Sequence, residues 1–236
     1  MTALVSPEGL VFDVPPWRLS GQVYGVLMNH RAALAALGDA ATQPPYGAAP
    51  KGVVLYVKPR NTLIEPGGAA LVDDPSQRLE VGAALGIVIG RTACAVAESG
   101  AMACVAGYVI VADFSVPHDT WFRPAIRFKA RDASCAIGPR VVAREAIADA
   151  GALEVGVYVD GALVHVVGMG GTFRSVARLV ADVSEFMTLA PGDVLMAGVA
   201  PGAPTVGAGA RVAIKIDGLG RLETRVLASA DAATTQ

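Results

Sequence analysis

Charged residues follow an apolar segment in the middle of the chain. The segment Tyr108–Ala112 is apolar and rich in β-branched residues, which predicts a buried strand. Asp113 comes directly after it, and Lys129, Arg131 and Asp132 follow within a region that contains prolines. An acid at the end of a buried strand, with basic residues nearby, suits a site that binds an anionic substrate. The alternative is an ordinary strand end followed by a solvated run of charges.

The elements expected around these residues are mostly short strands. Strands are predicted at 23–27, 53–58, 79–90, 153–159, 162–167, 194–197, 211–216 and 222–227. The turn Asp160-Gly161 between two of them predicts a hairpin. Helices are predicted at 31–37 with Asn29 as N-cap, at 98–105 and at 175–187. Many strands and few helices predict a β-rich mixed α/β fold, not a doubly wound one.

Length and composition favour one soluble domain. The chain has 236 residues, and we expect an irregular lead-in over 1–22, a single domain over 23–228 and a disordered tail over 229–236. Hydrophobic residues make up 53% and charged residues 17%, yet no run of about 18 apolar residues is present, which argues against a membrane span. The excess apolar surface predicts subunit interfaces, hence a homo- or hetero-oligomer.

Charge and cysteine content exclude other classes. A net charge of −2 without a basic stripe argues against a nucleic-acid partner. The first residues lack a basic segment followed by an apolar core, so no signal peptide is predicted. Cys94, Cys104 and Cys135 form no CxxC pair, and we interpret them as reduced, buried thiols of a cytoplasmic protein.

Several short segments occur in an order typical of a known family. They are LMNH at 27–30, VKPRNT at 57–62, IVIG at 87–90, DFS at 113–115, RPAIRFKARD at 123–132, IGP at 137–139 and EFMTLAPGD at 185–193. From about Val23 to Val226 the chain resembles the fumarylacetoacetate hydrolase family. The resemblance implies a rolled mixed β-sheet, or partial barrel, with peripheral helices.

Members of that family bind Mg²⁺ or Mn²⁺ through an E-x-E pair on one strand and an aspartate on the next. Residues i and i+2 of a strand point the same way, so such a pair presents two oxygen ligands to one ion. Here the two glutamate positions hold Gly82 and Ala84, and only Asp113 remains. The resemblance therefore implies that this chain binds no metal itself. As an alternative, Glu80, Asp113 and His118 surround an ion, although Glu80 is displaced by about 7 Å along the strand.

Two further family positions also differ. The histidine that serves as base elsewhere in the family falls on Ala33, with His30 displaced toward the helix start, and the family's G-T-P threonine falls on Val199. These departures resemble the N-terminal half of the bifunctional isomerase/decarboxylases of 4-hydroxyphenylacetate catabolism. The resemblance implies a subunit of a 5-oxopent-3-ene-1,2,5-tricarboxylate decarboxylase (a lyase activity) and 2-hydroxyhepta-2,4-diene-1,7-dioate isomerase. The alternative is a non-catalytic paralogue that supports a metal-bearing partner subunit.

The resemblance also implies roles for individual residues. Lys129 occupies the position of the family's active-site lysine and, with Asp113, is the expected catalytic pair. A surface lysine, or one paired with Asp132, is the competing interpretation. The ligand implied is a small 2-oxo di- or tricarboxylic acid, whose carboxylates we expect to be bound by basic side chains. These are Arg123, Arg127, Arg131 and Lys58.

Overall fold

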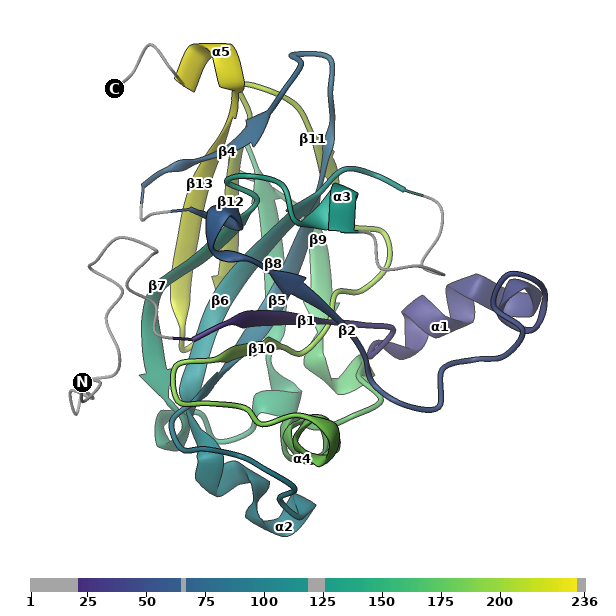
Figure 1. Cartoon of the computed structure of the whole chain (residues 1–236). Helices are drawn as coiled ribbons and strands as arrows, with labels where there is room; N and C mark the ends of the chain where they lie inside the picture. The colour runs from purple at the N-terminus through teal and green to yellow at the C-terminus, as the bar shows by residue number, and fades with distance from the viewer. Residues whose placement is uncertain (1–20, 65–66, 119–125, 233–236) are drawn as a thin grey trace.

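Two β-sheets form the body of the protein (Figure 1). The computed structural model describes residues 21–64, 67–118 and 126–232. Within these ranges the larger sheet has eight strands in the order β2-β1-β10-β5-β6-β7-β3, with β11 beside β5. Its strands are β1 Val23–Leu27, β2 Val54–Lys58, β3 Leu63–Ile64, β5 Leu79–Ile89, β6 Val105–Ser115, β7 Cys135–Ala143, β10 Val194–Met196 and β11 Thr205–Val206.

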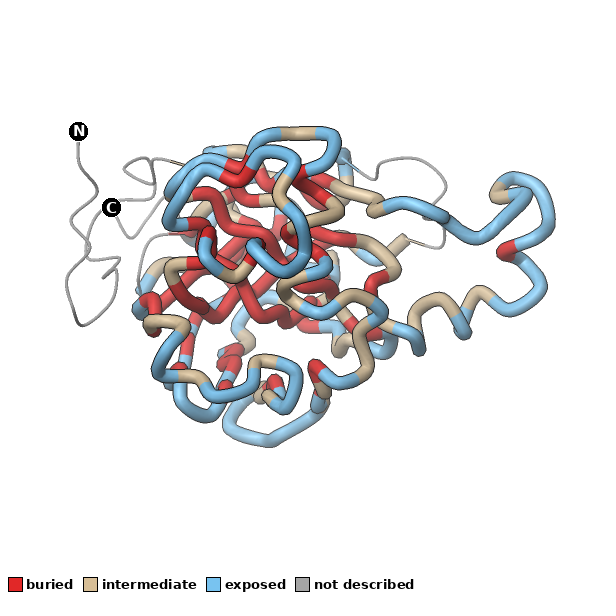
Figure 2. Tube along the Cα trace, turned by 90° about the horizontal axis from the view of Figure 1, so that it is seen from below, coloured by how far each residue is buried: buried red, intermediate tan, exposed pale blue. Residues whose placement is uncertain are grey.

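The second sheet has five strands in the order β4-β13-β12-β8-β9. They are β4 Ala69–Val72, β8 Glu154–Val159, β9 Ala162–Gly168, β12 Arg211–Ile216 and β13 Gly220–Ala228. Apolar side chains of both sheets form one core, which includes Leu85, Ile110, Ile214 and Val226. In Figure 2 the buried segments accordingly gather in the centre of the body.

The antiparallel pair β5–β6 is the centre of the larger sheet. Both strands are buried on both faces, which explains their almost continuous apolar sequences. Odd-numbered residues of β5, such as Leu85, point into the core shared with the second sheet, whereas Ala84 and Val88 point to the other face. The register pairs Gly82 with Asp113, so these two residues lie side by side on that other face.

The helices are short and peripheral. The α-helices are α1 Arg31–Leu37, α2 Glu98–Ala101, α3 Ile126–Lys129, α4 Val176–Phe186 and α5 Ser229–Ala232. The 3₁₀ helices are η2 Gly38–Thr42, η3 Arg60–Thr62, η4 Met102–Cys104, η5 Arg144–Ala146, η6 Ala150–Ala152 and η7 Met169–Gly171. In α4 the Ser175 hydroxyl caps the N-terminus, and Leu179, Val180 and Val183 pack into the core. No helix of the described ranges is long and apolar enough to cross a membrane.

Residues 31–52 form an arm that leaves the body at the end of β1 (Figures 1 and 2). None of the seven residues of α1 is buried. Asn29 is not the N-cap that the sequence predicts, because His30 takes that position. The Asn29 amide instead donates to the Ala197 carbonyl over 2.7 Å and accepts from the Arg174 backbone N–H over 3.1 Å. Asn29 thus fixes the base of the arm to two distant segments.

The β-rich mixed α/β fold is confirmed, and the differences are local. Asp113 lies inside β6, which extends two residues beyond it, so it does not follow the strand as predicted. The helix predicted at 98–105 is split into α2 and η4. Helix α5 occupies the start of the predicted tail. The predicted lead-in lies outside the described residues except at its end.

Candidate functional site

Asp113 is the centre of a buried charge cluster. Its side chain is 0% exposed on the face of the larger sheet that points away from the second sheet. The Lys58 ammonium, from β2, lies 2.9 Å from Oδ1, and the Lys129 ammonium, from α3, lies 3.0 Å from Oδ2. The Tyr56 hydroxyl donates to Oδ2 over 2.5 Å. Side chains from two elements, β2 and α3, therefore converge on one carboxylate of β6.

Lys58 is held as part of the protein interior. Its side chain is fully buried, and its ammonium donates to the Phe114 carbonyl over 3.1 Å and to Ser134 Oγ over 3.0 Å. It also donates to the backbone carbonyl of Lys129. With these acceptors and Asp113, the ammonium has partners for all its protons. Lys58 therefore positions Asp113 and α3, and its side chain does not reach the cavity described below.

The cluster keeps Asp113 ionised. Burial by itself raises the pKa of the Asp113 carboxyl, but the Lys129 and Lys58 charges outweigh it and hold the pKa well below its usual range. Burial and the Asp113 charge raise the pKa of Tyr56 well above 10.0, so Tyr56 stays a neutral hydrogen-bond donor. Two ammonium groups and one carboxylate leave the cluster with a net positive charge.

A cavity of about 250 Å³ adjoins this cluster. Its polar lining comes from Tyr56, Glu80 and Lys129. The Lys129 ammonium also lies over the Tyr56 ring, 4.6 Å from its centroid. The rest of the wall is apolar and comes from the end of β1, from α1 and from residues 199–201. A positive charge at the floor of a small, mostly apolar cavity suits an anionic organic ligand.

Glu80 brings a carboxylate to the same cavity. It lies on β5 two residues before Gly82 and opposite Ser115 of β6, and therefore on the same face as Asp113. Because Gly82 has no side chain, nothing on β5 separates Glu80 from the cluster. Burial raises the pKa of the Glu80 carboxyl, against the opposing effect of the Lys129 charge.

The residues present do not fit a divalent metal ion. Both oxygens of Asp113 already contact ammonium groups, and Gly82 and Ala84 offer no ligand. Among the described residues, no three histidine, cysteine or carboxylate side chains are grouped to hold an ion. His118 stacks on Phe128 at 5.1 Å. The alternative set of Glu80, Asp113 and His118 therefore gains no support.

Two other basic residues predicted as ligands, Arg127 and Arg131, lie at or near the surface. Arg131 pairs with Asp73. Arg127 is exposed, with its guanidinium 5.3 Å from the centroid of the Phe128 ring. Arg123 lies outside the described residues. The suggested partner of Lys129, Asp132, instead accepts a hydrogen bond from Asn61 over 2.5 Å.

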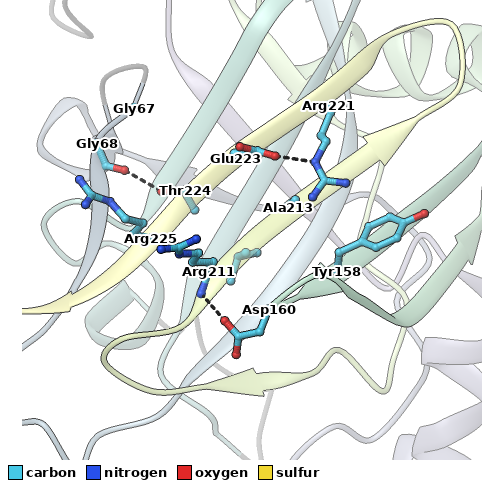
Figure 3. A pocket seen from close by; sticks show the side chains of 12 residues that line it. Gly67, Gly68, Tyr158, Asp160, Arg211, Ala213, Arg221, Glu223, Thr224 and Arg225 are labelled. Carbon is cyan, nitrogen blue, oxygen red and sulfur yellow. Dashed lines mark hydrogen bonds and ion pairs between the residues drawn. The ribbon is translucent and has the colours of Figure 1, made fainter.

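A larger hollow of about 680 Å³ lies on the outer face of β12 and β13 (Figure 3). Arg211 and Arg225 are cross-strand partners there, and Arg221 pairs with Glu223 over 2.6 Å. All four side chains are exposed. Because the hollow lacks the buried, interlocked charges found around Asp113, we assign the chemistry to the smaller cavity.

The family model for the fumarylacetoacetate hydrolase C-terminal domain matches residues 22–227. The chain belongs to the fumarylacetoacetate hydrolase family. The rolled-sheet fold expected from the sequence is thereby confirmed. The match includes every residue of the Asp113 cluster and the cavity, so both belong to the family domain.

Proteins of known name are similar to this chain in sequence and in structure. The chain is 34% identical to the 4-hydroxyphenylacetate degradation bifunctional isomerase/decarboxylase of Salmonella dublin, over 92% of this chain and 50% of that protein. It thus spans about half the length of this relative and of the Escherichia coli protein of the same name. The solved 5-carboxymethyl-2-hydroxymuconate delta-isomerase of Mycobacterium smegmatis is 27% identical with a TM-score of 0.72, covering 89% of this chain and 80% of that one.

A second solved structure shares the fold and carries a metal. The fumarylpyruvate hydrolase of Pseudomonas aeruginosa, solved with Mn²⁺ and pyruvate, has a TM-score of 0.72 and 24% identity, covering 88% of this chain and 90% of that one. A protein that binds Mn²⁺ and pyruvate thus has the same fold as this chain.

Tyr56 is the residue of the cluster that the sequence did not single out. It lies two residues before Lys58 on β2, so both side chains point to the same face. This i, i+2 spacing was the sequence signal that could have identified Tyr56 as a neighbour of Lys58. Glu80, which the sequence suggested as an alternative metal ligand, lies in the wall of this cavity.

Proposed function

We propose that this chain is a subunit of a decarboxylase/isomerase that acts on small 2-oxo or enol di- and tricarboxylic acids of aromatic catabolism. The main support for this proposal is the position of the Lys129 ammonium, which is ion-paired with Asp113 and lines a small cavity. The printed name of the relative at 34% identity supports this substrate class. We further propose that the protein is cytoplasmic and works as an oligomer, with itself or with a metal-bearing paralogue.

The cavity suits stabilisation of an enolate. Decarboxylation and isomerisation of 2-oxo acids both place negative charge on the carbonyl oxygen, and a preoriented cation lowers the energy of that state. Lys129 supplies such a cation, and its ion pair with Asp113 fixes its position. The apolar wall excludes water, which strengthens the interaction. Arg127 and Arg123 remain the proposed partners of a distal carboxylate.

A second candidate is the non-catalytic paralogue. The absence of side-chain ligands at Gly82 and Ala84, together with the sealed position of Lys58, favours a chain that supports a metal-bearing partner. In that case the cluster is a structural replacement for the metal site. The two candidates differ in whether the chain alone turns over substrate.

The test is an absorbance assay with a 2-hydroxy-2,4-diene dicarboxylate and the purified chain after EDTA treatment. We expect turnover without added metal, loss of turnover in Lys129→Met, and no change in Arg140→Gln, which alters an exposed residue of β7. Circular dichroism checks that each variant is folded. Turnover only after a metal-bearing paralogue is added would support the second candidate and contradict the first.

A further inference from the structure

Proton transfer in this cavity needs a group that can both accept and release a proton. Asp113 is buried behind its partners and makes contacts through both oxygens. The Tyr56 hydroxyl donates its proton to Asp113, and Lys129 is the cation of the site. These three groups bind one another, and none of them is arranged to exchange a proton with a ligand.

Glu80 differs from the other polar groups that line the cavity. Its carboxylate makes no hydrogen bond or ion pair with another described residue, although it lies in the cavity wall with Lys129. Across the sheet, Ser115 is 1% exposed, and its Oγ also has no hydrogen-bond partner within the described ranges. Ser115 does not line the cavity, so Glu80 is the carboxylate there that no described side chain engages, and it is the group available to a ligand.

We propose that Glu80 is the catalytic acid–base residue of this cavity, acting on a 2-oxo di- or tricarboxylic acid. This role rests on the proposed function. The Glu80 carboxylate takes a proton from C3 of the bound acid, and the C–H electron pair forms the C2=C3 bond. The former C2=O π pair moves to the oxygen, where the Lys129 ammonium stabilises the enolate. Return of the proton to C3 regenerates the carboxylate. For a conjugated dienol the carboxylate takes the proton of the 2-hydroxyl instead, the oxygen pair re-forms C2=O, the C2=C3 pair becomes C3=C4, and the C4=C5 pair accepts the proton at C5 to give the isomerised ketone.

Position supports this division of roles. Gly82 lies directly opposite Asp113 and two residues from Glu80 on the same face of β5. A Cβ there would approach Val199 to 3.2 Å and the Asp113 carbonyl to 2.8 Å, so this close approach of the strands requires glycine. Glu80 and Lys129 therefore line the same cavity with no side chain of β5 between them. A carboxylate on one side and a cation on the other suit a C–H bond next to a carbonyl.

The experiment follows exchange of the C3 protons of 2-oxoadipate in D₂O by NMR, with EDTA present. We expect Glu80→Gln to slow exchange at least about a hundredfold, as loss of a general acid–base does. Glu80→Asp should give an intermediate rate, because it keeps the carboxylate one methylene further back. The matched control is Glu154→Gln, an exposed position at the start of β8.

Binding of oxalate, a planar dianion resembling the enolate, is measured by calorimetry on the same proteins. Retained oxalate affinity in Glu80→Gln together with lost exchange would support the role. Wild-type exchange in Glu80→Gln, or in Glu80→Asp if the former does not fold, would overturn it while the proposed function stands. No exchange by the wild-type chain would refute the proposed function, and the role of Glu80 with it.

Discussion

Replacement of Lys58 by methionine tests whether the buried charge cluster stabilises the fold. The substitution keeps much of the side-chain volume but removes an ammonium whose partners include Asp113 and Ser134. Breaking a buried ion pair by removing one partner costs about 3–5 kcal/mol. Because Lys129 and Tyr56 still bind Asp113, we expect the lower part of that range. For a protein of this size this lowers the melting temperature by at least about 6 °C.

The assay is urea unfolding at pH 7, with Arg131→Gln as the matched control. Arg131 also pairs with an aspartate, but the side chains of Arg131 and Asp73 are 27% and 68% exposed. An exposed pair contributes less than about 1 kcal/mol, so this variant should remain close to the wild type. Equal and small losses in both variants would refute the claim that the cluster is a stability element.

The same variant has a defined pH dependence. The pKa of Asp113 is lowered in the folded state, so its contribution is complete above the unfolded value of about 3.9 and is lost as pH falls below it. The difference in unfolding free energy between wild type and Lys58→Met should therefore be constant from about pH 5 upward and shrink toward pH 3. A difference that grows as the pH falls would show that the sign is wrong.

Two further outcomes are expected. Tyr56→Phe removes the 2.5 Å hydrogen bond to an ionised carboxylate, and urea unfolding should show a loss of about 1.5–3 kcal/mol; an unchanged midpoint would contradict the geometry. Of the three cysteines, Cys94 is exposed, contrary to the expectation from sequence, whereas Cys104 and Cys135 are buried, and burial raises the pKa of Cys135 to about 12. DTNB should therefore react rapidly with one thiol per native chain and with three after denaturation, and rapid reaction of a second native thiol would contradict the burial.

The strands were predictable because their patterns are local. Strand β5 is a continuous apolar run, and the hairpin β8–β9 turns at Asp160-Gly161. The exact extent of β6 was not predictable, since Asp113 and Ser115 are polar residues inside a strand. They are tolerated there because partners from other elements surround Asp113. Local sequence does not contain that information.

The sequence predicted some residues of the site, but not how they are arranged. Asp113 and Lys129 were expected together and are in contact. Lysine is almost never fully buried unless paired, so Lys58 was assigned to substrate and not to the interior. Lys58 lies on β2, which is four strands away from β6 in the order of the larger sheet. Its pairing with Asp113 therefore depends on the tertiary fold, in which Lys58 also contacts Lys129 of α3. The place of Glu80 in a cavity wall was not predictable for a similar reason, because α1, α3 and residues 199–201, which complete the wall, lie far from it in the sequence.

The arm has a consequence for any ligand that enters the cavity. Ala33, Ala36 and Leu37 form part of the cavity wall, yet α1 has no buried residue and is too short to persist as an isolated helix. Local opening of the arm therefore requires little free energy compared with opening of the sheets. A ligand that contacts this wall makes apolar contacts with α1 and thereby stabilises the folded arm. Affinity at this cavity is thus thermodynamically linked to the folding equilibrium of the arm, and a substitution in the arm changes binding without touching the charges that recognise the ligand.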